Sequence, residues 1–203
     1  MDGLVVRRME PQEQDAVLDV LADAFADQPN TLAVFQGDAS RARKLTREGL
    51  RVVKLSRPVA SLWVAERDGQ IVGALNVVDW PHCQPGTGEK LRSMPRMLPA
   101  IGRALPRAMQ VMGAWEKRDP KRDHAHFGPV GVAPSTQGAG IGSAMMREVL
   151  ATLDRRGSAS YLETDRARNV PFYERLGYRV VGEEEILRVH QWYMWRDPRP
   201  ATE

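Results

Sequence analysis

Cysteine is almost absent from the chain, since Cys83 is the only one in 203 residues. A lone cysteine excludes an internal disulfide, which agrees with a reducing compartment, so we expect a cytoplasmic location. Cys83 stands in the turn-like stretch PHCQPGTG, where only His82 could act on it locally. A nucleophilic thiol needs an activating partner, so an ordinary loop thiol is favoured over a catalytic one.

Long apolar runs and targeting signals are also missing. No stretch approaches the ~20 apolar residues of a membrane span. The first residues, Met1 to Arg8, contain neither an apolar segment of signal-peptide length nor a small-residue cleavage site. We therefore expect no membrane partner.

Motifs for nucleic acid or metal are not apparent either. The formal net charge is only +3, and no basic stretch is interleaved with aromatic residues, so we expect no nucleic-acid partner. Locally positive surface would still suit an anionic ligand such as a nucleotide. No group of histidine, cysteine and carboxylate residues has the spacing of a metal site, so we predict no metal.

The length and apolar content predict one domain over residues 1–203, because 42% apolar residues in 203 can form one well-buried core. In the first half we expect a strand at Leu4–Arg8, an amphipathic helix after it that DQPN ends, a helix over 39–54, and a hairpin of strands 61–66 and 70–79. The middle segment, Pro81 to Asp123, carries Pro95, Pro99 and Pro106, which predict short or kinked helices.

The second half begins with a strand candidate, HAHFGPVGV, before a glycine-rich segment. We then expect a helix to about Asp154, a strand over 160–164, a short helix over 172–176, strands in YRVVGEEEI and HQWYMWR, and a frayed tail over 197–203.

The glycine-rich segment TQGAGIGSAMM lies between the predicted strand and the predicted helix. The first amides of a helix lack internal partners and favour an anion, and glycines let phosphates approach the backbone. The segment has neither the Lys–Ser/Thr ending of a P-loop nor the GxGxxG of dinucleotide-binding folds. Spacing alone leaves phosphate binding and a simple tight turn both open.

Two flanking motifs carry a family resemblance. VGVAPSTQGAGIGSAMM and, downstream, LETDRARNVPFYERLGYRVVGE resemble the two signatures of the GCN5-related N-acetyltransferase (GNAT) family. Within it, DAFADQPNT, LWVAE and QWYMWR make the chain most similar to the puromycin N-acetyltransferase type. The resemblance implies an α/β fold with a central mixed, mostly antiparallel sheet flanked by helices, and a cofactor-binding unit over about 124–182.

The same resemblance implies acetyl-CoA as cofactor. Its expected contacts are Val130, Gly131, Val132, Gln137, Gly138, Ala139, Gly140, Ile141, Gly142, Ser143, Asn169 and Tyr173. Tyr173 matches the family's general acid, and a phenol with an ordinary pKa near ~10 is protonated at neutral pH. Packing in the core is the alternative role for this side chain.

The base that takes the amine proton is less defined by sequence. Glu163, in a strand beside the cofactor unit, is the leading candidate, and His124 and His126 are rivals. From position alone, Phe25, Asp27, Asp79, Trp80 and Trp192 are candidates for the substrate wall.

The expected function is transfer of an acetyl group from acetyl-CoA to a primary amine of a small molecule by direct attack on the thioester. An aminonucleoside-like antibiotic is one candidate acceptor, which would make the chain a resistance enzyme. Acetylation of a protein N-terminus or lysine, and a non-catalytic acyl-CoA-binding regulatory module, are the alternatives. We expect a monomer or a homodimer, and the acceptor's identity is left open.

Overall fold

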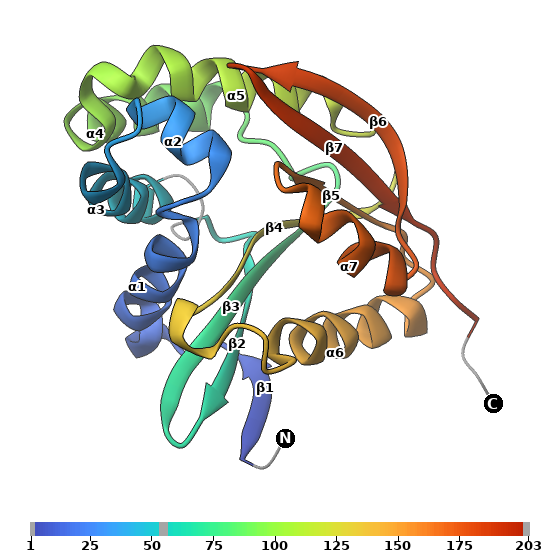
Figure 1. The fold of residues 1–203 in the computed structure, drawn as a ribbon. Coiled ribbons are helices and arrows are strands. Elements are labelled where there is room, and N and C mark those ends of the chain that lie inside the picture. Colours follow the sequence, from blue (N-terminus) through green and yellow to red (C-terminus); the bar gives the residue numbers. More distant parts are fainter. Residues whose placement is uncertain (1–2, 53–56, 201–203) are drawn as a thin grey trace.

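A computed structural model describes residues 3–52 and 57–200 and contains a seven-stranded sheet (Figure 1). The strands run in the order β1-β2-β3-β4-β5-β7-β6, and every neighbouring pair is antiparallel except β4 and β5. Their bounds are β1 Leu4–Arg8, β2 Ser61–Arg67, β3 Gln70–Asp79, β4 Ala125–Val132, β5 Ser160–Thr164, β6 Arg179–Ile186 and β7 Val189–Arg196. The expected mixed, mostly antiparallel α/β fold is confirmed.

The hairpin of β2 and β3 forms because its turn residues accept a left-handed backbone. Asp68 and Gly69 have φ angles of 52° and 75°, which short hairpin turns require. The flanking strands pair from Arg67↔Gln70 onward. The predicted hairpin is therefore confirmed.

Helices cover both faces of the sheet. Helix α6 (Ile141–Arg155) packs into the same core as Ala65 and Leu75, whereas α1 (Gln14–Phe25) packs with Val64 and Ala74. Neighbouring residues of a strand point to opposite faces, so α1 and α6 lie on opposite faces. The short helix α7 (Val170–Arg175) lies beside α6 (Figure 1).

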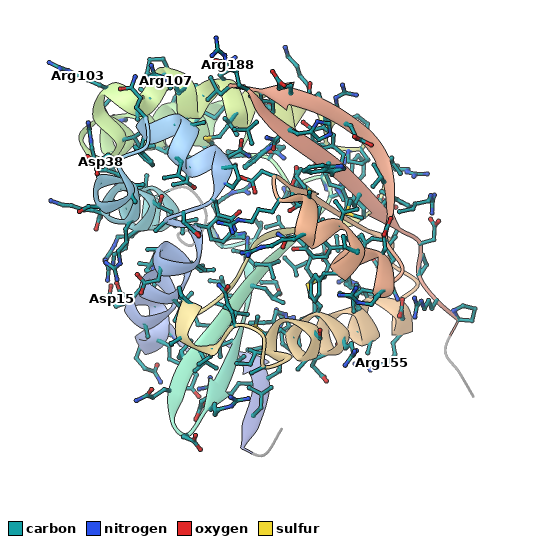
Figure 2. All side chains as sticks on the ribbon, in the orientation of Figure 1. Asp15, Asp38, Arg103, Arg107, Arg155 and Arg188 are labelled. Atoms are coloured by element: carbon teal, nitrogen blue, oxygen red, sulfur yellow. The ribbon has the colours of Figure 1, made fainter. Side chains whose placement is uncertain are left out.

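A second helical group, α2 (Pro29–Phe35) and α3 (Ala39–Leu50), follows α1. Asp15, Asp19 and Asp23 recur at helical spacing on α1 and pair with the basic face of α3, through Arg43, Arg47 and Arg51. Asp15, labelled in Figure 2, lies in the first turn of α1. Helix α2 was not expected, because DQPN indicates only a break; Pro29 instead lies in the first turn, where its missing amide costs no hydrogen bond.

The middle segment forms α4 (Thr87–Ile101) and α5 (Leu105–Arg118). The prolines predict short or kinked helices; the segment is divided as expected, but the helices have 15 and 14 residues, and α4 runs through positions 95 and 99. It ends at Gly102, whose φ of 56° is left-handed. None of the helices in the described ranges has both the length and the apolar character needed to cross a bilayer.

The C-terminal residues 197–200 are held, although we expected a frayed tail. Asp197 pairs with Arg179, and the Arg199 amide donates to Asp154 Oδ1 at 2.8 Å. Residues 201–203 of the predicted tail, and residues 53 and 54 of the helix predicted over 39–54, lie outside the described residues.

Candidate active site

The site begins where β4 and β5 separate. Their parallel pairing covers only Ala125↔Ser160, His126↔Tyr161 and Phe127↔Leu162. From there to Val132, β4 stays paired with β3 on its other side alone. The β5-facing edge of β4 therefore offers backbone N–H and C=O groups to a ligand instead of to a strand.

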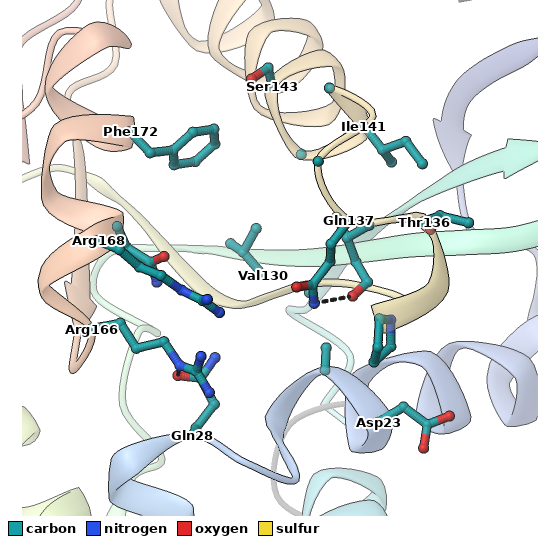
Figure 3. A pocket seen from close by; sticks show the side chains of 18 of the residues that line it. Asp23, Gln28, Val130, Thr136, Gln137, Ile141, Ser143, Arg166, Arg168 and Phe172 are labelled. Carbon is teal, nitrogen blue, oxygen red and sulfur yellow. Dashed lines mark hydrogen bonds between the residues drawn. The ribbon is translucent and has the colours of Figure 1, made fainter.

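A cavity of about 610 Å³ borders this open edge, and we call it the cofactor cavity (Figure 3). All but one of the residues predicted to contact the cofactor line this cavity. Ala139 is the exception: it is exposed and does not line the cavity. The lining comprises Val130, Gly131, Val132, Gln137, Gly138, Gly140, Ile141, Gly142, Ser143, Asn169 and Tyr173 among others.

The N-terminus of α6 faces this cavity with unused amides. Gly138 and Gly140, with φ angles of 82° and 78°, turn the chain into the helix through a left-handed backbone that other residues rarely adopt. The first amide with a helical acceptor is that of Ala144, which donates to Gly140 O at 3.0 Å. The preceding three amides, at 141–143, have no backbone acceptor within the described ranges, so together with the helix dipole they suit an anion.

Arg166 and Arg168 reach into the cofactor cavity from the segment before α7 (Figure 3). Arg166 Nη2 forms an ion pair with Asp27 Oδ1 at 2.6 Å, and Arg166 Nε donates to Gln28 Oε1 at 3.1 Å. Arg168 is exposed, and no ion pair to it occurs in the part of the chain that the structure covers. Sequence analysis missed both cations, although the basic pair in DRARN directly precedes the predicted contact Asn169.

The side chain of Gln137 also holds the glycine-rich loop in place. Its side-chain amide donates to Val132 O at 3.0 Å and so fastens the glycine-rich loop to β4 (Figure 3). The Asn169 side chain donates to Thr164 Oγ1 at 3.1 Å. The loop and the β5 end are thereby fixed on opposite sides of the cavity.

A second cavity, of about 290 Å³, adjoins the first, and we call it the apolar cavity. Its walls come from α2, α3 and α5 on one side and from β4 and β5 on the other. Gln28, Val130, Asn169 and Tyr173 line both cavities, so the two meet at these side chains. The larger apolar and aromatic lining residues include Phe25, Val34, Phe35, Leu45, Leu50, Ile101, Val111, Met112, Trp115, Phe127 and Leu162.

Tyr173 lies at the junction of the two cavities and is only 7% exposed. Burial raises its pKa well above the ordinary value, and the nearby charge of Asp165 raises it further. The phenol therefore keeps its proton at neutral pH and can donate it. Tyr173 thus lines both cavities, and its role as a general acid stays a prediction.

Two carboxylates line the apolar cavity, Glu163 and Asp165. Glu163 Oε2 lies 2.9 Å from His126 Nε2, while Oε1 has no hydrogen-bond partner among the described residues. His126 Nδ1 in turn lies 2.8 Å from Asp119 Oδ1. Burial disfavours charge on His126, but Glu163 and Asp119 outweigh that cost and raise its pKa well above the ordinary value.

The family model of the acetyltransferase (GNAT) family matches residues 27–178. These residues include the cofactor cavity's glycine-rich loop, Asn169 and Tyr173. The chain belongs to the GNAT family.

Two similar proteins extend this result. The chain is 27% identical over 183 residues to the mycothiol acetyltransferase of Streptomyces avermitilis. That match covers 87% of the chain but 43% of the relative, so the chain spans less than half of the relative's length. A Corynebacterium glutamicum structure named histone acetyltransferase HPA2 and related acetyltransferase matches over 99% of both chains, with a TM-score of 0.71 and 22% identity.

A GNAT acetyltransferase from Brucella melitensis was solved with acetyl-CoA and matches with a TM-score of 0.53 and 19% identity over 98% of this chain and 91% of that one. GNAT enzymes use acetyl-CoA, and the residues of this cavity fit it. The unused α6 amides and Arg168 suit its phosphates, and the open β4 edge suits its extended, amide-containing arm.

Three of the predicted substrate-wall residues lie outside both cavities. Asp79 is at the exposed end of β3, where it pairs with Arg156, and Trp80 beside it is 37% exposed. Trp192 packs its ring 4.3 Å from that of His190. None of the three lines either cavity. Asp79 and Trp80 lie where the end of β3 pairs with the start of β4, whereas the cavities lie where β4 leaves β5.

The other two predicted wall residues divide between the cavities. Phe25 lines the apolar cavity as expected, whereas Asp27 lines the cofactor cavity and pairs with Arg166. Of the rival bases, His126 lines the apolar cavity and His124 does not; His124 Nδ1 lies 2.7 Å from the Arg122 carbonyl.

Asp165 is a functional candidate that the sequence did not single out. It accepts the Asn30 amide at 2.8 Å, and Asn30 exchanges two side-chain hydrogen bonds with buried Gln191. Burial raises the pKa of Asp165 above its ordinary value. The only signal in the sequence was its place two residues after Glu163, on the way to Asn169.

Proposed function

We propose that this GNAT enzyme acetylates the primary amine of a small molecule that has an apolar or aromatic body. The observation that carries the proposal is the apolar cavity, which meets the cofactor cavity at Tyr173. Its aromatic and aliphatic walls favour an apolar body, and its two carboxylates favour a cationic amine. Walls contributed by both helices and strands leave a bounded space suited to a small molecule more than to a peptide chain.

Acetyl-CoA supplies an activated acetyl thioester when it is bound. Glu163 Oε1, which has no other partner within the described ranges, is positioned to take a proton from the ammonium group. Tyr173 holds a proton on its buried hydroxyl and is positioned to give it up at the junction of the two cavities. Asp165 contributes negative charge that holds the amine near this junction.

The test is a turnover screen of the full chain with acetyl-CoA, in which released thiol is measured. The acceptors are puromycin, an aliphatic polyamine, an aminoglycoside and a peptide with a free N-terminus. We expect acetylation of puromycin, an aminonucleoside with an aromatic body, in line with the resemblance to the puromycin N-acetyltransferase type. Transfer to the peptide alone would establish a protein acetyltransferase instead. Acetyl-CoA binding without turnover on any amine would indicate a binding module.

A matched pair of variants tests the cavity itself. Met112 lines the apolar cavity, whereas Met109 on the same helix is 38% exposed and lines neither cavity. Met112→Trp should fill the cavity and raise the KM for the acceptor while acetyl-CoA affinity stays unchanged. Met109→Trp is the control, and an equal effect of both substitutions contradicts the assignment of the acceptor site.

A further inference from the structure

Four metal-ligating side chains meet in the interior beside the active site. Cys83 comes from the loop after β3, Asp119 from the end of α5, His124 from the residue before β4, and His126 from β4 itself. All four are buried. Sequence spacing predicted no metal site because Asp119, His124 and His126, although close in the chain, do not have a familiar ligand spacing, and only the fold brings the distant Cys83 to them.

The distances between the donor atoms are those of a nearly formed tetrahedral site. Cys83 Sγ and Asp119 Oδ1 each lie 3.5 Å from His124 Nε2. All four donor atoms lie within 4.8 Å of one another. Zinc–ligand distances of about 2.0–2.3 Å in a tetrahedral site separate the donors by about 3.3–3.8 Å. Small side-chain movements therefore suffice to bring the most distant donors together and to separate His126 Nδ1 from Asp119 Oδ1, which lie 2.8 Å apart.

The hydrogen bonds of the two histidines leave the correct nitrogens available. His124 Nδ1 lies 2.7 Å from the Arg122 carbonyl, which can only accept, so Nδ1 carries hydrogen and Nε2 faces the cluster. His126 Nε2 lies 2.9 Å from the Glu163 carboxylate, so in the same way Nδ1 faces the cluster. A carbonyl or carboxylate behind each imidazole is the usual outer shell of a metal-binding histidine.

We propose that Cys83, Asp119, His124 and His126 bind one zinc ion. One thiolate, one carboxylate and two imidazoles form a mixed sulfur, oxygen and nitrogen set that suits tetrahedral Zn²⁺. The two negative ligands balance the charge of the ion. Zinc thereby gives this buried polar cluster a neutral total charge.

The ion would join parts of the chain that the sheet does not connect. Asp119 ends α5, the helix that lines the apolar cavity through Val111, Met112 and Trp115. His126 lies on β4, the opposite wall of the same cavity. Zinc would hold these walls together, and its bond to His126 Nδ1 would fix Nε2–H on Glu163, which makes His126 a positioning residue.

The first experiment measures metal in the full native chain, without substrate or turnover. Protein purified from zinc-supplemented cells and dialysed against metal-free buffer should contain one zinc per chain by mass spectrometry. After removal of the zinc, added Co²⁺ should give the visible bands of a tetrahedral ion and a thiolate-to-cobalt charge-transfer band. Substoichiometric zinc together with the spectrum of hydrated Co²⁺ overturns the proposal.

Variants then locate the ion. Cys83→Ser should abolish the charge-transfer band, and His124→Ala should lose bound zinc, whereas His82→Ala, an exposed neighbour of Cys83, should behave as native. Chelation should lower the melting temperature of the native chain and of His82→Ala, since zinc binds the folded state. An unchanged charge-transfer band in folded Cys83→Ser overturns the assignment. Because metal content is read without catalysis, a failed acetylation screen leaves this result intact.

Discussion

His126 donates its Nε2 hydrogen to Glu163 Oε2 across neighbouring parallel strands, at 2.9 Å. The register that pairs His126 with Tyr161 places Glu163 two residues further along β5, on the same face as Tyr161. The contact leaves the buried Glu163 Oε1 without a hydrogen-bond partner among the described residues, and the residue lines the apolar cavity. A carboxylate fixed by one oxygen and unoccupied at the other is suited to take a proton.

Glu163→Gln should lower kcat by about 10²-fold or more, because the amide can still accept from His126 but cannot act as a base. The defect should shrink as the pH rises toward the pKa of the acceptor amine, since a neutral amine needs no base. Steady-state rates over a pH series measure both effects. Glu185→Gln, an exposed carboxylate on β6, is the control. A Glu163→Gln enzyme with native rates at neutral pH contradicts the role.

Tyr173→Phe should lower kcat by about 10²-fold or more while the Kd for acetyl-CoA changes little, because only the proton donor is removed. Calorimetry and steady-state kinetics separate the two quantities. Tyr178→Phe is a matched control: Tyr178 is also buried, its ring is 5.8 Å from that of Tyr173, and it lines neither cavity. Equal activity losses in both variants would show that the effect on Tyr173 is structural.

Much of the fold was predictable because its signals are local. The strand over 160–164 and the hairpin around Asp68 and Gly69 follow from apolar patterning and turn residues within a few positions. Helix α2 was missed because Pro29 was interpreted as a break, whereas proline in a first turn lacks only an amide that the helix does not use. Whether a proline begins or ends a helix depends on packing that the local sequence does not contain.

The site divides in the same way. The glycine-rich loop, Asn169 and Tyr173 belong to short continuous motifs, so most of the residues predicted to contact the cofactor line one cavity, whereas Arg166 and Arg168, which only the fold directs into it, were missed. The apolar cavity could not, because its walls come from α2, α3 and α5, which only the tertiary fold brings together. The placement of Trp80 could not be predicted for the same reason. Trp80 follows β3, whose end pairs with the start of β4, whereas the apolar cavity lies where β4 leaves β5.

Arg168→Gln should weaken acetyl-CoA binding about tenfold, or about 1.4 kcal/mol, because one exposed cation next to the phosphates is lost. The affinity that remains should also depend less steeply on salt. Calorimetric titration with acetyl-CoA at two ionic strengths measures both. Arg155→Gln is the control, since Arg155 lies at the far, C-terminal end of α6 (Figure 2). Native affinity in Arg168→Gln removes this residue from the phosphate site.

Asp165→Asn should raise the melting temperature at pH 7. Burial raises the folded-state pKa of Asp165 above its unfolded value, so the folded chain holds the proton more tightly and loses stability as the pH rises through the folded pKa. Asparagine removes that loss and can still accept the Asn30 amide. The difference from the native chain should therefore vanish by about pH 3, below the unfolded-state pKa of ~3.9, where both folded and unfolded Asp165 are protonated.

Melting curves from about pH 3 to pH 8 test this prediction, with Asp123→Asn, an exposed aspartate, as the control. The same variant should raise the KM for a cationic acceptor, because the charge that costs stability is the one that holds the amine in the apolar cavity. A lower melting temperature at every pH would mean that α2 needs the carboxylate as a cap. A higher melting temperature with an unchanged KM would show that Asp165 does not bind the acceptor, so that its buried charge costs stability without contributing to activity.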